Sequence, residues 1–167
     1  LDGVVARAEE ARAVLGREGD LAIDFHGRMS IVDSRRLIPR LAKVAPLFVE
    51  EPVVPEQTHL LSQLTDLGVP IATGERLFSR REFLPAFEAG ISVAQPDISH
   101  AGGISEVARI TTMAEVWGVH VAPHCPLGPI ALASSLQIAF SKHNFLIQEI
   151  SAGIHYNAGA DLLDYLV

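Results

Sequence analysis

The sequence predicts an α/β fold, in the form of an incomplete TIM (β/α)8-type barrel with about six βα units. Short apolar runs rich in β-branched residues alternate with longer helical patterns along the 167 residues. Gly68, Gly90 and Gly118 each follow a helical pattern and precede an apolar run, where a helix C-cap is expected. A polar residue also stands near the C-terminal end of each apolar run. No linker interrupts the series, so we expect residues 1–167 to form a single partial barrel domain.

The apolar runs predict six strands. In chain order they are 21–25 (LAIDF), 47–51 (LFVEE), 70–75 (PIATGE), 91–97 (ISVAQPD), 119–124 (VHVAPH) and 145–150 (FLIQEI). Helical patterns precede and separate them, at residues 3–17, 33–44, 56–67, 79–89, 103–117 and 128–142. Six units of roughly 25 residues make up about three-quarters of the ~250 residues of a complete eight-fold barrel.

The composition is that of a globular domain that acts on small molecules. With 49% hydrophobic and 20% charged residues, the chain has enough apolar mass for a core. A net charge of −7 without clustered Lys and Arg argues against a nucleic-acid partner. The single cysteine, Cys125, excludes an internal disulfide, and no apolar run approaches the ~20 residues of a membrane span. We therefore expect a cytoplasmic protein with no membrane partner and, because the chain begins with Leu1, a fragment.

Six polar residues mark the C-terminal ends of the predicted strands. They are Asp24, Glu50, Glu75, Asp97, His124 and Glu149, each about one βα unit from the next. Any one of them could be a solvated or N-capping side chain, but six at the same register are hard to explain in this way. A barrel would gather them at one rim, where active sites are built, whereas a doubly wound open sheet would spread them along a line. This placement favours the barrel.

The first three of these residues predict a metal site. Asp24, Glu50 and Glu75 lie on successive strands, and three converging carboxylates repel one another unless a cation lies between them. Oxygen ligands in that number suit Mg²⁺ or a similar hard divalent ion. In the sequence LFVEEP only one of Glu50 and Glu51 can point inward, and the spacing alone does not say which.

Two histidines flank the predicted carboxylate group. His26 shares a strand face with Asp24, and His124 ends a later strand. Imidazole is the side chain best suited to move protons near neutral pH. Asp97, on the strand before His124, is placed to orient that imidazole through a hydrogen bond.

Three further residues are predicted to lie near this rim. His100 and Arg76 could contact a substrate, and a structural hydrogen bond explains them about equally well. Cys125 follows His124 and therefore points to the other face of the strand, so we expect it to pack rather than to act as a nucleophile.

Several motifs resemble those of the enolase superfamily, in particular its mandelate-racemase type. They are DFHGR (24–28), FVEEP (48–52), ATGERLFSR (72–80), QPDISHAGGISE (95–106) and APHCPLGPIALA (122–133). Together with IQEI (147–150) and GIHYNAGADLLDYL (153–166), the set is most similar to the sugar-acid dehydratases of that superfamily that act on D-galactonate. The similarity covers nearly the whole chain from Leu21 onward.

The resemblance implies a role for each residue of the rim. One Mg²⁺ would be held by Asp24, Glu50 and Glu75, which also selects Glu50 over Glu51. The other implied roles are general base for His124, its dyad partner for Asp97, general acid for His26, and support of the developing enediolate for Glu149. The implied reaction is loss of water from a sugar acid, D-galactonate first, to give a 2-keto-3-deoxy acid.

The resemblance also implies parts that this sequence lacks. Family members carry an N-terminal capping domain and two barrel strands before the strand that holds Asp24. We therefore expect the isolated fragment to be inactive, and the full-length protein to be a homo-oligomer. The alternatives are a dehydratase acting on gluconate or mannonate, a racemase of the same superfamily, and an inactive truncated barrel that binds metal. Product analysis separates the dehydratases from the racemase, because only dehydration gives a keto acid.

Overall fold

The structure, a computed structural model, describes residues 1–150. The motif at 153–166 therefore lies outside the described residues. The chain forms two compact units. The first comprises residues 1–73 and 84–93, and the second comprises residues 74–83 and, within the described part of the chain, 94–150.

The first unit contains three parallel strands with helices between them. Its elements are α1 (Asp2–Leu15), β1 (Ala22–Asp24), α2 (Ile31–Leu41), the 3-10 helix η1 (Ala42–Val44), β2 (Phe48–Glu50), the 3-10 helix η2 (Pro55–Gln63) and β3 (Ile71–Thr73). β1 pairs with β2, and β2 pairs with β3. The N–H of Ser92, just before β4 (Val93–Ala94), donates to the carbonyl of Ile71 at 2.9 Å. β4 therefore begins beside β3.

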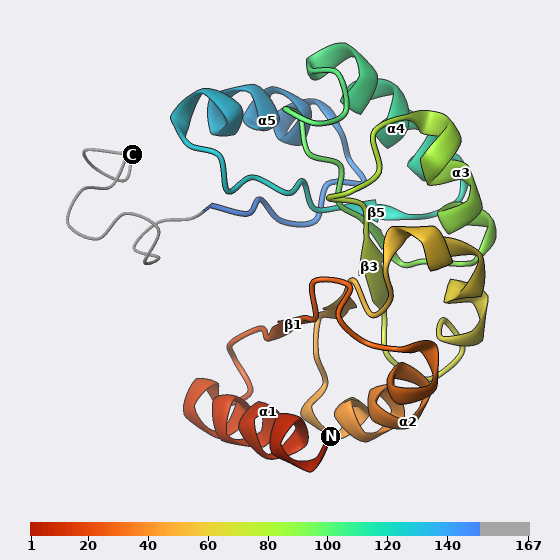
Figure 1. The fold of residues 1–167 in the computed structure, drawn as a ribbon. Helices are drawn as coiled ribbons and strands as arrows, with labels where there is room; N and C mark the ends of the chain where they lie inside the picture. The colour runs from red at the N-terminus through yellow and green to blue at the C-terminus, as the bar shows by residue number, and fades with distance from the viewer. Residues whose placement is uncertain (151–167) are drawn as a thin grey trace. The chain divides into compact units, whose positions relative to one another are not determined.

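Local sequence explains the helix that follows β1. Ser30 is its N-cap, and its hydroxyl accepts a hydrogen bond from the Asp33 N–H at 3.1 Å. Leu37, Ile38 and Leu41 recur at helical spacing and are completely buried. α1 and α2 lie side by side (Figure 1).

Arg12 ties the end of α1 to the segment after α2. Its guanidinium donates to the carbonyls of Val44 (2.8 Å) and Ala45 (3.2 Å), and to those of Gly16 (3.0 Å) and Gly19. These four carbonyls belong to segments where backbone groups lack helical partners. One side chain thus provides hydrogen-bond donors to the segments that follow both helices.

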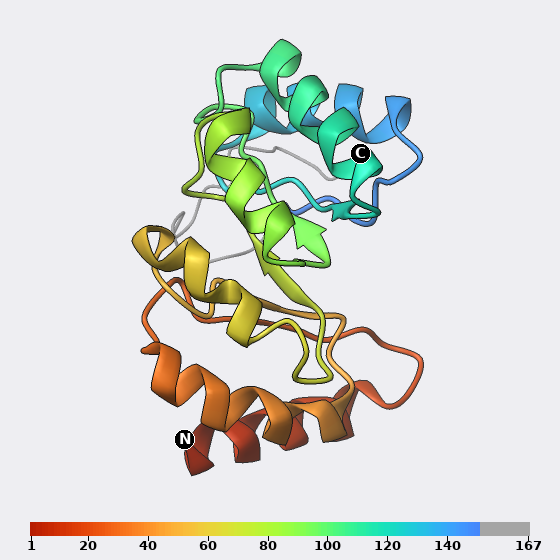
Figure 2. The same cartoon turned by 90° about the vertical axis from the view of Figure 1, so that its right-hand side faces the viewer.

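The second unit continues the same pattern. α3 (Arg80–Glu88) begins in it, and α4 (Ile104–Val116), β5 (His120–Val121) and α5 (Pro129–Ser141) lie within it. The Ala122 N–H donates to the Ala94 carbonyl at 3.0 Å, which places β5 beside the end of β4. α4 and α5 lie side by side (Figure 2). Within residues 1–150, none of the helices combines the length and apolar character that a membrane span requires.

The structure confirms the alternation of parallel strands and helices, with two corrections. Five of the six predicted strands are present, but residues 145–150 form a single parallel bridge, Val121 with Phe145, rather than a strand in the described part of the chain. The helix predicted at 56–67 is the 3-10 helix η2. Every strand is shorter than its apolar run. One reason is that positive φ values at His26 (49°), Glu51 (39°) and Gly74 (147°) turn the chain out of the sheet soon after a strand ends.

Gly74 is the position where glycine is required most clearly. Its φ of 147° is rarely adopted by residues with a side chain. A Cβ there would come within 2.7 Å of the Phe83 ring and 2.8 Å of the Gln95 backbone nitrogen. Glu75 follows directly, so its position depends on this close contact.

Candidate active site

The first unit brings two of the predicted metal ligands together. Asp24 and Glu50 are opposite one another in the parallel register of β1 and β2, each at the last position of its strand. Residues directly opposite in a parallel pair point to the same face of the sheet. The two carboxylates therefore share one face at the C-terminal edge.

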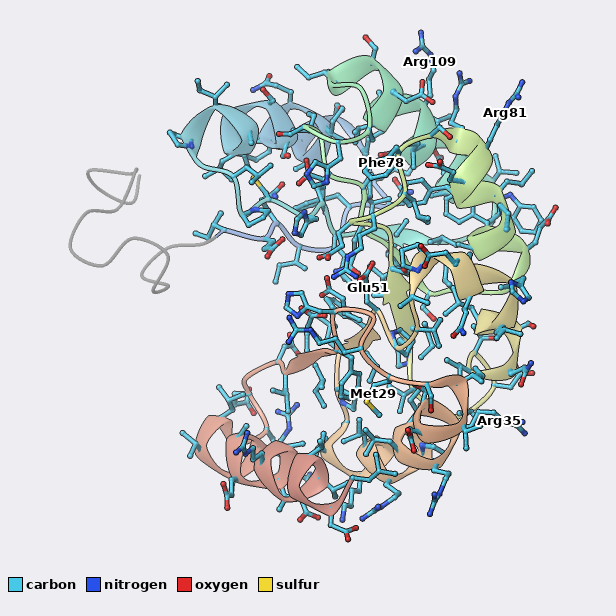
Figure 3. The ribbon with its side chains drawn as sticks, viewed as in Figure 1. Met29, Arg35, Glu51, Phe78, Arg81 and Arg109 are labelled. Carbon is cyan, nitrogen blue, oxygen red and sulfur yellow. The ribbon has the colours of Figure 1, made fainter. Side chains whose placement is uncertain are left out.

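The adjacent acidic residues Glu50 and Glu51 have different environments. Glu50 is half-buried, whereas Glu51 is 1% exposed and has a φ of 39°. Glu51 follows directly on β2 (Figure 3). Glu50 is therefore the more accessible of the two carboxylates.

His26 contacts Asp24, although it does not continue the strand on which the two were predicted to share a face. β1 ends at Asp24, and His26 adopts a left-handed conformation instead of continuing the strand. Its backbone N–H donates to Asp24 Oδ1 at 2.7 Å, and its Nδ1 lies 2.8 Å from Asp24 Oδ2. The contact therefore arises from a turn, and the imidazole, 53% exposed, lies at the protein surface.

The second unit contains a hydrogen-bonded pair of Asp97 and His124. His124 Nδ1 lies 2.7 Å from Asp97 Oδ2, and Asp97 is 1% exposed. Burial raises the pKa of Asp97, but the His124 hydrogen bond, the Ser99 N–H and the nearby imidazoles outweigh it, so this pKa is lowered. Asp97 is therefore an ionised acceptor, and the neutral form of His124 carries its proton on Nδ1.

The other nitrogen of His124 faces a third carboxylate. His124 Nε2 lies 3.3 Å from Glu75 Oε2. Burial lowers the pKa of His124, but the Asp97 hydrogen bond and the negative charges of Glu149 and Glu75 outweigh it, so the pKa is raised above its ordinary value. His124 therefore takes up a proton more readily than a free imidazole, and this is the property of a general base.

Glu149 is fixed next to this pair. Its Oε2 accepts a hydrogen bond of 2.7 Å from the backbone N–H of Cys125, the residue after His124. The thiol of Cys125 is buried, which raises its pKa more than the Ser135 hydroxyl lowers it. A protonated, inaccessible thiol is a poor nucleophile, so the packing role predicted for Cys125 is supported.

The sequence did not assign His100 to the site, but in the structure its ring lies near that of His124. Its Nδ1 lies 3.0 Å from the backbone carbonyl of Glu75. Its ring centroid is 6.0 Å from that of His124 and 6.0 Å from that of Phe78, which it meets edge-on at 71°. The only sequence signal was a histidine in the loop after a strand, which does not separate a site residue from a structural one.

Two sets of side chains are candidates for binding a metal. Among residues 1–150, Asp97, His100 and His124 each offer a ligand atom within 4.8 Å of the others. Two imidazoles and one carboxylate suit zinc-type ions better than magnesium, and Nδ1 of each imidazole already has a hydrogen-bond partner.

The predicted set is all-carboxylate and fits a hard divalent ion by its chemistry. Asp24 and Glu50 share one edge of the first unit, and Glu75 belongs to the second unit. The arrangement of the three together stays a prediction. Arg76 Nε donates to Glu75 Oε1 at 3.1 Å, so this carboxylate has polar neighbours on each oxygen.

Comparison with known proteins adds a family relationship. The family model described as "Enolase C-terminal domain-like" matches residues 1–167. The D-galactonate dehydratase of Xanthomonas axonopodis pv. citri is 50% identical over 169 residues, covering 100% of this chain and 44% of that protein. The D-galactonate dehydratase of Ralstonia pickettii is 50% identical over 168 residues, covering 99% of this chain and 44% of that protein. The chain thus spans less than half the length of these relatives.

Solved structures are similar to the chain in fold. A mandelate racemase/muconate lactonizing enzyme from Jannaschia sp. CCS1 has a TM-score of 0.87 and 32% identity, over 92% of this chain and 40% of that one. An enolase from Agrobacterium radiobacter, with sodium and L-malate bound, has a TM-score of 0.82 and 38% identity, over 86% of this chain and 37% of that one. The parallel α/β arrangement therefore matches part of an enolase C-terminal barrel.

Proposed function

This chain belongs to the enolase C-terminal domain-like family, and on that basis we propose that it forms most of the catalytic barrel of a Mg²⁺-dependent sugar-acid dehydratase, with D-galactonate as the substrate. The observation that carries the proposal is the pair of Asp97 and His124, joined at 2.7 Å. The pair occurs in a chain that is 50% identical to D-galactonate dehydratases.

His124 is the proposed general base. In its neutral form the proton stays on Nδ1, bonded to Asp97, and Nε2 is left to take the proton from C2 of the sugar acid. The carboxylate of Asp97 stabilises the imidazolium that results, because the bond becomes one between opposite charges. The raised pKa of His124 supports this direction of proton transfer.

His26 is the proposed general acid. Its imidazole lies against the Asp24 carboxylate and is partly exposed, so it can exchange protons with solvent and deliver one. When the C3–O bond breaks, this proton converts the leaving hydroxyl into water. The enol that remains tautomerises to the 2-keto-3-deoxy acid. Glu149, held beside the base by the Cys125 N–H, is proposed to support the enediolate as it develops on the substrate.

Asp24, Glu50 and Glu75 are proposed to hold one Mg²⁺, whose charge offsets the negative charge that builds up on the substrate carboxylate. The matched register of Asp24 and Glu50, and the partial exposure of Glu50, support the choice of these ligands. L-malate, bound to the Agrobacterium radiobacter relative, is a hydroxy acid and supports a substrate of that class.

The proposal is tested with the full-length protein that contains these residues. The protein is incubated in Mg²⁺ with D-galactonate, D-gluconate, D-mannonate and their epimers, and products are identified by keto-acid assay and NMR. We expect a keto acid from D-galactonate and little from the others. Racemised or epimerised acid without loss of water would identify a racemase instead. Metal binding without turnover of any acid would identify an inactive barrel.

A second measurement isolates the base. His124→Asn should lower the exchange of the C2 proton with D₂O about 10²–10⁴-fold, the range for loss of a general base, with metal binding retained. His143→Asn is the matched control, because His143 is 82% exposed and pairs with a helix carboxylate, Glu115, at 2.7 Å. Unimpaired exchange in His124→Asn would remove this residue from the role of base.

A further inference from the structure

One buried carboxylate positions both the proposed base and His100. Asp97 Oδ2 accepts the hydrogen bond from His124, while Oδ1 accepts the backbone N–H groups of Ser99 at 2.6 Å and His100 at 3.1 Å. Because Asp97 is 1% exposed, these bonds are shielded from water. The backbone that carries the His100 ring is thus held rigidly relative to His124.

The hydrogen bond to Glu75 determines which nitrogen of His100 can bind a ligand. Nδ1 lies 3.0 Å from the Glu75 carbonyl oxygen, which has no proton to donate. Nδ1 must therefore carry the proton, and Nε2 of the neutral ring is a hydrogen-bond acceptor. The side chain is 38% exposed, and its ring is held between Phe78 and His124. A fixed acceptor is thus presented close to the base.

From this geometry we infer that His100 binds the substrate, accepting at Nε2 a hydrogen bond from a hydroxyl that the sugar acid retains on C4, C5 or C6. The inference rests on the proposed function, because it takes the ligand to be a polyhydroxy acid held with C2 at His124. A hydroxyl group is the natural partner, since it can donate to a neutral imidazole, whereas a carboxylate cannot. His100 therefore helps to select acids that carry this hydroxyl.

Two substitutions separate the roles of the two nitrogens. In His100→Asn the side-chain amide nitrogen occupies roughly the place of Nδ1, so the bond to the Glu75 carbonyl is kept and the Nε2 acceptor is lost. In His100→Gln the amide oxygen can reach the place of Nε2, but the Nδ1 donor is lost. A merely structural role predicts damage in the Gln variant only, and substrate binding predicts damage in the Asn variant.

The experiment measures kcat and KM of the full-length protein in Mg²⁺ for D-galactonate and its 4-deoxy, 5-deoxy and 6-deoxy analogues. The kcat/KM of the wild type should be about tenfold higher for D-galactonate than for one of these analogues, which is the effect of one hydrogen bond in a partly buried site. In His100→Asn that preference should fall to near one, mainly through KM, while the rate for the matching analogue stays unchanged. His100→Gln should keep part of the preference.

Equilibrium binding of the same acids, measured by titration calorimetry, keeps the inference separate from the proposed reaction. If acids bind without turnover, the proposed function fails, and the loss of hydroxyl preference in His100→Asn still supports the inference. If His100→Asn weakens the binding of all four acids equally, or leaves the preference unchanged, the inference is overturned. Turnover of D-galactonate would still support the proposed function in that case. No binding of any sugar acid to wild type would overturn both.

Discussion

Replacement of Asp97 by Asn should disable the base while leaving the loop around it intact. Oδ1 of Asp97 accepts two backbone N–H groups, so the amide oxygen of Asn must take that place. The amide NH₂ then faces His124 Nδ1, 2.7 Å away in the wild-type pair, and forces that nitrogen to become an acceptor. The proton of neutral His124 moves to Nε2, which can no longer accept a proton from C2.

The size of this effect follows from two losses. A hydrogen bond to an ionised partner contributes about 1.5–3 kcal/mol, a factor of roughly 10 to 150 in rate. The change of tautomer removes the accepting lone pair as well, and the same substitution in another His-Asp pair lowers kcat by about 10⁴. We therefore expect C2 proton removal to fall about 10³–10⁴-fold in Asp97→Asn.

The assay is exchange of the C2 proton of D-galactonate with D₂O, followed by NMR in the full-length protein with Mg²⁺. Asp33→Asn is the matched control, because Asp33 is a partly exposed residue of α2 that contacts the N-cap Ser30. ¹⁵N NMR of the imidazole should show the proton of neutral His124 on Nε2 in the Asp97 variant. A loss of less than tenfold, or an unchanged tautomer, would show that Asp97 does not orient the base.

Three predictions concern stability and reactivity. Gly74→Ala should destabilise the protein by about 2–5 kcal/mol in urea unfolding, since the new Cβ lies 2.8 Å from the Gln95 nitrogen at a φ of 147°; a change below about 1 kcal/mol contradicts this. Arg12→Ala should lower the free energy of unfolding by about 1–3 kcal/mol, because four carbonyls lose their donor. Arg12→Lys should recover only part of that stability. Equal stability of wild type and both variants would show that these hydrogen bonds do not stabilise the fold. Cys125 should react slowly with iodoacetamide in the folded state. Burial raises its pKa above the ordinary 9.0, so the folded protein keeps a proton that the unfolded chain loses, and stability should fall as pH rises above that value. Cys125→Ala should show a smaller alkaline loss, and rapid alkylation of the folded protein would argue against burial of the thiol.

Sequence alone was sufficient for the order of the elements and for the pairing of Asp97 with His124. Strand and helix periodicities are local properties, and the glycines that end helices are local as well. A polar residue at the end of an apolar run is conspicuous because burial would be costly, and this identified both Asp97 and His124. The link between them was predictable, since successive parallel strands place their ends at the same edge.

The tertiary structure decided how these groups face one another. His26 reaches Asp24 through a left-handed turn, and Glu51 has a positive φ, and the strand period predicts neither conformation. The role inferred for His100 depends on a carbonyl 25 residues earlier in the chain. Periodicity determines the face of a strand on which a side chain lies. The loops after the strands, and the hydrogen bonds that select one nitrogen of a ring, depend on neighbours that are distant in sequence, and only the folded chain brings these together.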